Sequence, residues 1–227
     1  MLRISAEQGI RKLSTNGLTV KCNRLEGKVA IVTASTEGIG FAIARRLAQE
    51  GAKVMVSSRR ESNVKKAVEQ LKSEGLQVSG VICHVSKKDH RKNLFNKTKE
   101  EFGGLDILVS NAATNPSANT IFDTSEELWD KIFDVNVKST FLLMQESLPL
   151  LRESKSPSII LISSIAAYQP ITLVEGDIGD TSLSIIPMQR FGETNDIAGV
   201  AAFLASNDAA YITGETIVAA GGMQSRL

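Results

Sequence analysis

Residues Lys28 to Gly51 read KVAIVTASTEGIGFAIARRLAQEG, and they contain the strand, turn and helix that decide the fold. The run KVAIVTAS is short, apolar and β-branched, which is typical of a strand buried on both faces. Ile39, Ile43 and Leu47 then recur four residues apart, and Gly51 ends the periodic segment, as in a helix that packs one face against a sheet. A strand that leads through a glycine-containing turn into a helix is the opening unit of many nucleotide-binding α/β domains.

The alternation of strand and helix continues after this unit. Further predicted strands are KVMVSSR, QVSGVICHV, LDILVSNA and SIILISS, and the helical patterns between them are ESNVKKAVEQLKSEG, residues 87–102 and residues 125–152. Parallel strands require crossover connections, and these are nearly always right-handed. The sequence therefore predicts an α/β fold with a doubly wound parallel sheet of the Rossmann type, and a ligand crevice at the carboxyl ends of the strands.

The length and hydrophobic content indicate one globular domain. The chain has 227 residues, of which 42% are hydrophobic, and this is enough for a sizeable core. We expect that domain over residues 28–227, behind an N-terminal leader of residues 1–27 that has no periodic core. Arg3, Arg11 and Lys12 give the leader some transit-peptide character, but Glu7 and the lack of an amphipathic face favour a disordered or strapped-on segment.

Composition argues against several classes of function. The net charge is +1, from 26 basic and 25 acidic residues, and no basic stripe suggests a nucleic-acid partner. No apolar run is long enough for a membrane span. Cys22 and Cys83 are too few for a disulfide framework, which favours a reducing compartment. The pair Cys83-His84 has no second ligand pair nearby, so we expect no metal site.

The turn TASTEGIG, Thr33 to Gly40, has the position and composition of a dinucleotide-binding loop. Small residues let the backbone approach a pyrophosphate, and the following helix N-terminus offers unpaired N–H groups. The spacing is not G-x-G-x-x-G, so the strand–turn–helix context carries the interpretation. The residues that we expect to contact a cofactor here are Thr33, Ser35, Thr36, Gly38, Ile39 and Gly40.

The end of the second strand predicts which dinucleotide is bound. An NAD site usually places a carboxylate there against the ribose 2′-hydroxyl, but this strand ends SSRR, Ser57 to Arg60. Arg59 and Arg60 can pair with a 2′-phosphate and Ser58 can hydrogen-bond it. The alternative is solvated charge at a helix start, yet cations at a helix N-terminus oppose its dipole. The pattern therefore favours NADP(H).

Five segments of this chain resemble the short-chain dehydrogenase/reductase family. They are TASTEGIG, SNAA (Ser110–Ala113), DVNVKS (Asp134–Ser139), SSIAA (Ser163–Ala167) and ITGETIVAAGG (Ile212–Gly222). The resemblance covers Lys28 to about Pro170, and then about Ser182 to the end. It is similar in detail to a peroxisomal subgroup of NADP-dependent carbonyl and retinal reductases. The resemblance implies an oxidoreductase that reduces small carbonyl compounds, ketones or retinal, with NADPH.

The resemblance also implies roles for individual residues. Asn111 would lie beneath the cofactor ribose, and Val85 would line the adenine pocket. His84 stands where other family members carry an aspartate to the adenine amine, and we expect it to be a buried, hydrogen-bonded histidine. Asn136 would organise a proton-relay water. Ser164 would hydrogen-bond the substrate carbonyl and polarise it.

One part of the family pattern is missing. The acid of the family is a tyrosine four residues before a lysine, which lowers the tyrosine pKa and holds the nicotinamide ribose. Here Tyr168 is followed at the fourth position by Thr172, Tyr211 is followed by Glu215, and no lysine occurs after Lys155. We interpret this as an internal deletion that leaves the chain weakly active or inactive. Tyr168 is only a weak candidate to replace the lost acid.

The deletion also has consequences for the fold. It would remove the catalytic helix and the sixth strand, so we expect a sheet that is incomplete at the sixth strand. The last family strand, here GETIVAA, must pair with the fifth strand directly or leave that edge open. The junction over residues 171–186 should be irregular.

Three hypotheses of function follow from these patterns. The chain is a weakly active carbonyl reductase, or a non-catalytic NADP-binding or interaction variant that docks on full-length subunits, or a product without a stable fold. We expect a homo-oligomer, or a hetero-oligomer with the full-length form, and the apolar residues around Trp129 are either core or subunit contact. The terminal Ser-Arg-Leu resembles a peroxisomal address, with mitochondrion or cytosol as alternatives.

Overall fold

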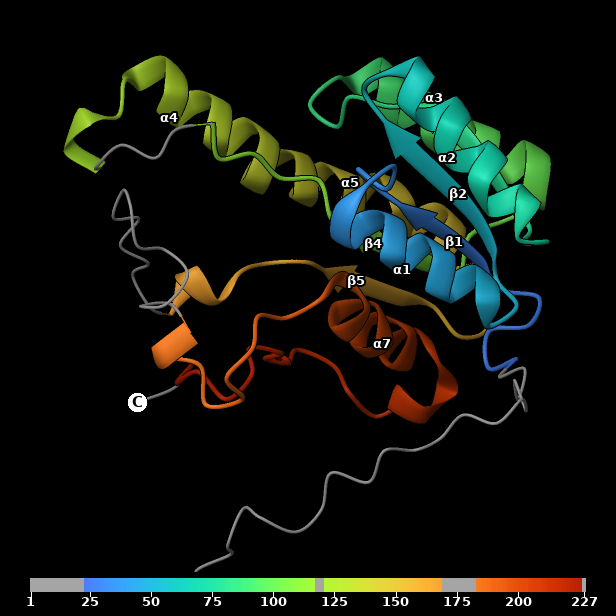
Figure 1. Cartoon of the computed structure of the whole chain (residues 1–227). Coiled ribbons are helices and arrows are strands. Elements are labelled where there is room, and N and C mark those ends of the chain that lie inside the picture. The colour runs from blue at the N-terminus through green and yellow to red at the C-terminus, as the bar shows by residue number, and fades with distance from the viewer. Residues whose placement is uncertain (1–22, 117–120, 169–182, 226–227) are drawn as a thin grey trace, which may run out of the picture.

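A five-stranded parallel sheet lies at the centre of the computed structural model, which describes residues 23–116, 121–168 and 183–225 (Figure 1). The strand order is β3-β2-β1-β4-β5 and every pairing is parallel. The bounds are β1 (Val29–Val32), β2 (Lys53–Ser58), β3 (Val78–Ile82), β4 (Ile107–Ser110) and β5 (Ser158–Leu161). This order confirms the predicted Rossmann-type sheet, in which the direction of winding reverses beside β1.

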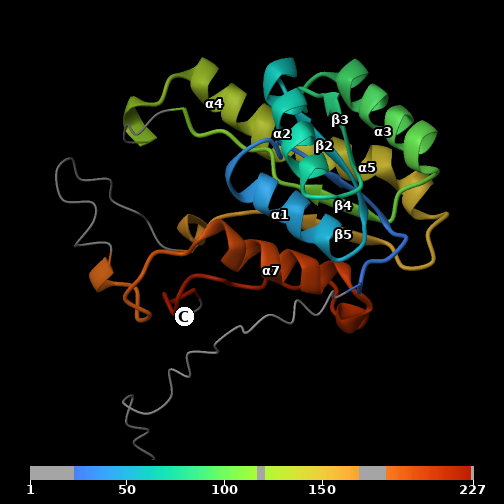
Figure 2. The same cartoon turned by 45° about the vertical axis from the view of Figure 1, so that its right-hand side comes forward.

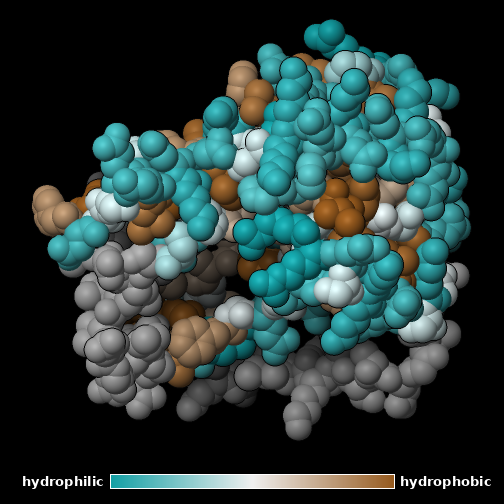
Figure 3. All heavy atoms as spheres, turned by 90° about the horizontal axis from the view of Figure 1, so that it is seen from above, coloured by the Kyte–Doolittle hydropathy of each residue, from teal (hydrophilic) through white to brown (hydrophobic). Residues whose placement is uncertain are grey.

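Helices cover both faces of this sheet. Their bounds are α1 (Gly38–Gln49), α2 (Glu61–Ser73), α3 (Lys88–Phe102), α4 (Glu126–Phe133), α5 (Ser139–Leu151) and α7 (Thr194–Ala205). Hydrophobic side chains of α1, α2 and α7 join one core cluster, and those of α3 and α5 join another. Figures 1 and 2 agree that α1 and α7 lie side by side under the sheet. The outer faces over α2 and α3 are mostly hydrophilic (Figure 3).

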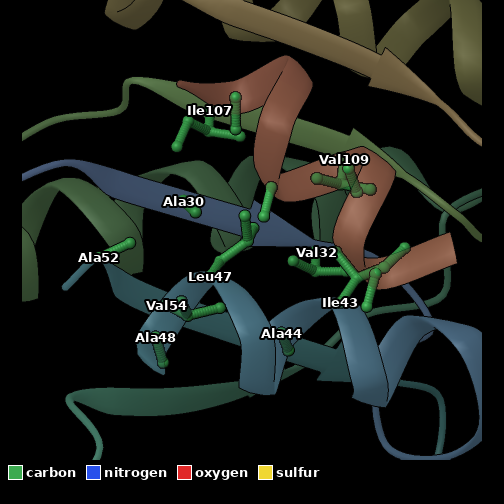
Figure 4. Close-up of a cluster of buried hydrophobic side chains, with 14 of the residues drawn as sticks. Ala30, Val32, Ile43, Ala44, Leu47, Ala48, Ala52, Val54, Ile107 and Val109 are labelled. Atoms are coloured by element: carbon green, nitrogen blue, oxygen red, sulfur yellow. The ribbon is translucent and has the colours of Figure 1, made fainter. Parts of the chain in front are cut away.

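The alternation of side chains along β1 explains the two clusters. Ala30 and Val32 point to the first cluster, where they meet Ile43 and Leu47 of α1 (Figure 4), and Ile31 points to the second. All of these side chains are fully buried. The apolar run of the first strand is therefore buried on both faces, as its composition predicts.

The predicted long helix over residues 125–152 is interrupted. Its N-cap is Ser125, whose Oγ accepts from the backbone N–H of Leu128 at 3.3 Å. Between α4 and α5, residues Asp134–Lys138 form a π-helical turn. Ser139 Oγ donates to the backbone oxygen of Val135 at 2.6 Å just after this turn. Such turns are rare and often lie at functional sites, and the periodicity of the sequence does not reveal this one.

The sheet ends at β5 within the part of the chain that the structure describes. Ile159 and Leu161 of β5 remain 38% and 49% exposed, which agrees with the expectation of an open edge. The expected last strand, residues 214–220, has no strand conformation. A single extended segment needs a paired neighbour to form a strand, and this one pairs with none of the described strands. Most of the predicted irregular junction, residues 169–182, lies outside the described residues.

The N-terminal boundary is partly visible. Residues 1–22 of the expected leader lie outside the described structure, but residues 23–27 form a turn against the domain. Leu25 is fully buried, and its N–H donates to the backbone oxygen of Glu50 at 2.9 Å. Among the described helices, none is both long enough and apolar enough to cross a bilayer.

Candidate nucleotide-binding site

A cavity of about 300 Å³ lies at the carboxyl ends of β1, β2, β3 and β4. Four of the predicted site residues line it, namely Thr36, Ser58, Arg59 and Val85. They come from the ends of three different strands, because parallel strands bring their carboxyl ends to one edge of the sheet. The volume is at the lower end of the range for small-molecule sites.

The turn between β1 and α1 has the geometry of a phosphate-binding loop. Gly38 has φ of +58°, which favours glycine, and a Cβ built on it would meet nothing within 4 Å. A Cβ on Gly40 would collide with the backbone oxygen of Ala34 and the side chain of Asn111. In the described structure, the side chain of the N-cap residue Glu37 makes no capping bond. The first-turn N–H groups of α1 are thus left for an anion.

Thr33 and Ser35 shape this loop from inside. Thr33 Oγ1 accepts from the backbone N–H groups of Asn111 and Ala112, at 2.9 and 3.0 Å. Ser35 Oγ donates to Val32 and accepts from the backbone of β2. Both side chains are fully buried. Their hydroxyl groups therefore hold the loop in place, and any contact that these two residues make with a cofactor has to come from the backbone.

Asn111 supports the same loop from the end of β4. Its Nδ2 donates to the backbone oxygens of Thr33 and Ala34, at 3.0 and 3.1 Å. Ala34 is held with φ of 49°, a left-handed conformation that is uncommon for alanine. These bonds tie the end of β4 to the loop after β1, and the expected place of Asn111 beneath the cofactor ribose stays a prediction.

The arginine pair divides between two positions. Arg59 lines the cavity beside Ser58, whereas Arg60 is the exposed N-cap residue of α2 and lies outside the cavity lining. Ile39, also predicted as a cofactor contact, is 37% exposed at the start of α1. Both arginines are exposed, but only Arg59 belongs to the lining of the cavity where a nucleotide would lie.

His84 differs from its expectation as a buried, bonded histidine. It is half-buried, it lines the cavity, and its sealed Nδ1 has no hydrogen-bond partner among the described residues. Burial lowers the pKa of His84, and the charges of Arg59, Lys87 and His90 lower it further, against the opposing effect of Asp134. The neighbouring Cys83 is a buried thiol whose pKa burial raises to about 12, so it is unreactive.

None of the predicted catalytic residues is part of the lining of this cavity. Ser164 is exposed, and its Oγ accepts from the backbone N–H of Ala166 at 3.1 Å at the start of a short 3₁₀ turn, Ile165–Ala167. Tyr168 is 45% exposed. Both amide atoms of Asn136 are bonded to the backbone of Thr114. Its backbone oxygen accepts from Thr140 Oγ1 at 3.0 Å.

The structure adds lining residues that the sequence patterns did not single out. Lys131 of α4 and Asp134 of the π turn also line the cavity. The nearby Ser86 hydroxyl lowers the pKa of the Asp134 carboxyl, and so do Lys138 and His84, although burial opposes this. DVNVKS was noted as a motif, but only the three-dimensional path of the helix shows that its first residue reaches the cavity.

These features fit a dinucleotide. Phosphate groups can approach the backbone at Gly38, where there is open space, and the N–H groups at the start of α1, which has no side-chain cap. Arg59, at the end of β2, supplies a positive charge beside them. The fold and this site together define a Rossmann-type dinucleotide-binding domain.

Comparison with known proteins identifies the family. Residues 28–175 match the family described as short chain dehydrogenase, and residues 174–224 match the family described as Enoyl-(Acyl carrier protein) reductase. The chain belongs to the short-chain dehydrogenase/reductase family, which is a family of oxidoreductases whose members bind nicotinamide cofactors.

Three relatives illustrate the similarity. Tropinone reductase-like 3 of Erythroxylum coca is 44% identical over 249 residues, covering 90% of this chain and 96% of its own length. Dehydrogenase/reductase SDR family member 4 of Homo sapiens is 40% identical over 262 residues, covering 95% and 94%. Dehydrogenase/reductase SDR family member 2, mitochondrial, also of Homo sapiens, is 39% identical over 256 residues, covering 92% and 91%.

The coverage of these alignments also shows how many positions of a relative have no counterpart in this chain. The alignment with tropinone reductase-like 3 has 249 positions, but 90% of the 227 residues supplies only about 204 of them. About 45 positions of that relative therefore have no counterpart in this chain.

Proposed function

We propose that this chain binds NADP(H) in the cavity at the strand ends. The observation that carries the proposal is the position of Arg59 and Ser58, which line the cavity at the end of β2 where an NAD site would present a carboxylate. The start of α1 at Gly38 would hold the pyrophosphate, and the guanidinium of Arg59 would pair with the 2′-phosphate. When bound, the cofactor supplies the hydride for carbonyl reduction.

We further propose that the reaction of the site is the NADPH-dependent reduction of ketones or retinal, and that this chain performs it weakly or not at all. Ser164 hydrogen-bonds the carbonyl, and Asn136 fixes the loop after β4. Support for the weak activity comes from the absence of any tyrosine followed four residues later by lysine in the sequence. The roughly 45 unmatched alignment positions are enough to contain that unit.

The size of the catalytic loss follows from the missing groups. A general acid typically contributes a factor of about 10²–10⁴ to the rate. A misplaced hydride donor costs about another 10². Tyr168 has no lysine four residues on, so it lacks the cationic partner that the acid of the family has.

The test of the proposal compares cofactor binding with turnover. We expect NADPH to raise the melting temperature of the full chain more than NADH does, and Arg59→Ala to remove most of that difference. Arg60→Ala is the matched control, because Arg60 lies outside the cavity lining. Equal stabilisation by NADPH and NADH, or equal effects of the two substitutions, would contradict the assignment.

An exposed apolar surface along α4, the π turn and α5 favours a second function, the binding of another subunit. Trp129, Phe133, Val137 and Phe141 recur every four residues along α4, the π turn and α5, and about half of each side chain is exposed. Trp129 and Phe133 stack with ring centroids 4.6 Å apart. We propose that this stripe is a subunit contact, through which the chain forms a homo-oligomer or docks on full-length subunits. Light scattering of the chain alone and mixed with the full-length form tests this.

The remaining expectations concern the ends of the chain. We propose that residues 1–27 are a leader on a single NADP-binding domain of residues 28–227. The terminal Ser-Arg-Leu, whose last two residues lie outside the described structure, supports a peroxisomal location. A mitochondrial location is the alternative, because one relative carries that word in its name, and the cytosol is a third. Import that is unchanged after removal of Leu227 would contradict the peroxisomal assignment.

A further inference from the structure

The sheet has an open edge at β5, its last strand (Figure 1). β4 pairs with one side of β5, and none of the described strands pairs with the other side. An unpaired edge presents backbone N–H and C=O groups that another strand can bind. No residue of β5 lines the nucleotide cavity, and β5 is not part of the apolar stripe on α4 and α5. This edge is therefore a separate candidate for an interaction surface.

The backbone groups available at this edge belong to two residues. The N–H of Ser158 donates to the residue before β4 at 2.8 Å, and the N–H of Ile162 donates to the end of β4 at 3.0 Å. Successive residues of a strand direct their N–H and C=O groups to alternate sides, so Ile160 faces β4 as well. Ile159 and Leu161 consequently direct their backbone groups away from the sheet.

The same two residues also carry uncovered apolar side chains. Ile160 belongs to the first core cluster and is buried. Because side chains alternate along a strand, Ile159 and Leu161 lie on the opposite face of the sheet, where more than a third of each remains exposed. A strand that pairs with this edge would therefore meet both hydrogen-bonding groups and apolar surface.

The charge of this region suits a second copy of the chain. Residues 157–164, PSIILISS, contain no charged side chain, and the net charge of the whole chain is only +1. Exposed edges are commonly protected by a lysine, another charge or a proline within the strand. The one proline here, Pro157, precedes β5. Two copies can thus approach without strong repulsion, and a highly charged partner would gain nothing from this edge.

The edge is also complementary to itself. In an antiparallel pair of β5 strands centred on Ile160, Ile159 of one copy lies opposite Leu161 of the other, and each such pair exchanges two backbone hydrogen bonds. Their apolar side chains then cover each other across the axis. Centring on Ile159 instead would set Leu161 opposite Pro157, which has no N–H. Centring on Leu161 would set Ile159 opposite the polar Ser163.

We propose that the open edge of β5 binds β5 of a second copy of this chain, antiparallel about a two-fold axis at Ile160, so that two five-stranded sheets become one continuous sheet. A two-fold contact of this kind is closed and ends at a dimer. β5 has only four residues, so the contact is small and the dimer dissociates on dilution. The inference depends neither on the NADP(H) site nor on the apolar stripe.

Amide hydrogen exchange of the full chain, followed by NMR at low and high protein concentration, tests the hydrogen bonds. The N–H groups of Ile159 and Leu161 should exchange several-fold more slowly at high concentration, whereas that of Ile160, which faces β4, should be protected at both. Ile159→Lys should abolish this change. Ile82→Lys is the matched control, because Ile82 is 37% exposed on β3, at the other edge of the sheet, and Ile159 is 38% exposed.

Cysteine pairing tests the register. In a chain that carries Cys22→Ser, a mixture of the Ile159→Cys and Leu161→Cys proteins should form a disulfide-linked dimer on mild oxidation. Either protein alone should form little. Opposite residues of a hydrogen-bonded antiparallel pair have Cα atoms about 5.5 Å apart, which a disulfide can span. The remaining Cys83 is buried.

Light scattering of the wild type, Ile159→Lys and Phe141→Lys separates this contact from the apolar stripe. We expect a dimer that Ile159→Lys loses, and slowed exchange at Ile159 and Leu161 that survives Phe141→Lys. A wild type that stays monomeric, or a dimer that Ile159→Lys leaves intact, would overturn the inference. Equal cross-linking of each cysteine variant alone would contradict the register, and particles that grow without limit would contradict the closed two-fold contact.

Discussion

Asn136 and Thr114 are joined by two reciprocal hydrogen bonds. Asn136 Nδ2 donates to the backbone oxygen of Thr114 at 2.9 Å, and its Oδ1 accepts from the N–H of Thr114 at 2.7 Å. The pair ties the loop after β4 to the π turn between α4 and α5. Because Thr114 lines the cavity, this link positions one wall of the nucleotide site, and the amide is already fully used by the protein.

Asn136→Ala should therefore lower both the free energy of unfolding and the affinity for nucleotide. Two half-buried backbone groups would lose their partner, at about 1–3 kcal/mol of the free energy of unfolding, and nucleotide affinity should fall as the loop loosens. Asn93→Ala, an exposed position on α3, should change either quantity little. Denaturant unfolding and nucleotide titration measure both. An unchanged free energy of unfolding for Asn136→Ala would contradict this role.

Gly40 and Gly38 should respond differently to alanine. Gly40→Ala places a methyl group against Ala34 and Asn111, and such overpacking costs about 1–3 kcal/mol. Gly38→Ala has open space but a left-handed backbone, which costs about 1–2 kcal/mol, and its methyl group enters the cradle for the phosphate. We expect both variants to lose stability, Gly40→Ala the more, and Gly38→Ala to lose the larger share of nucleotide affinity. The reverse order in melting experiments and titrations would refute this loop geometry.

Ala34→Gly should stabilise the protein. Alanine at φ of 49° is strained, and this strain, about 1–2 kcal/mol, exceeds the extra entropy that glycine gives the unfolded chain. We expect a net gain of about 0.5–1 kcal/mol in denaturant unfolding. A loss of stability would show that the loop does not hold Ala34 in the left-handed region.

The sequence patterns predict the strands and helices better than they predict which residues line the cavity. Buried apolar runs and glycine stops such as Gly51 identify the strands and helices, because each depends on neighbours close in the chain. The position of Arg59 follows from strand alternation and parallel pairing. Lys131 and Asp134 escape such reasoning, since their place in the cavity depends on the path of the chain through α4 and the π turn. His84 was expected to find a protein partner, and only the fold shows that its ring has none among the described residues.

The expected last strand is a prediction from sequence that the structure does not confirm. Residues 214–220 have the composition of a strand, but local preference does not form a strand without a partner. Pairing depends on the neighbour at the edge of β5, and the described part of the chain provides none.

Glu50 should make the protein sensitive to acid. It is almost fully buried between Arg24, at 2.8 Å, and Arg46, at 2.6 Å. Desolvation raises the pKa of Glu50, but the hydrogen bonds and charges of the two arginines outweigh it, and the pKa is lowered below 4.5. Its contribution to stability is therefore complete above pH 4.5 and is lost as the pH falls through the folded value.

The matching variants are Glu50→Gln and Glu74→Gln. Removing one charge of a buried cluster costs about 3 kcal/mol or more, whereas Glu74 forms a more exposed pair with Arg45 that is worth about 1 kcal/mol or less. Unfolding measured from pH 7 to pH 3 should show a smaller acid loss for Glu50→Gln than for the wild type. Equal acid losses would mean that Glu50 is not the group responsible.

The most direct test of the account is the oxidation of NADPH by the 227-residue protein, with a ketone or retinal as substrate, under conditions where calorimetry shows the cofactor site to be saturated. Dehydrogenase/reductase SDR family member 4 of Homo sapiens serves as the comparison. We predict that cofactor binding persists while turnover falls by about 10⁴ or more, because no tyrosine of the chain is followed four residues later by a lysine. Turnover within about tenfold of the relative would contradict the account.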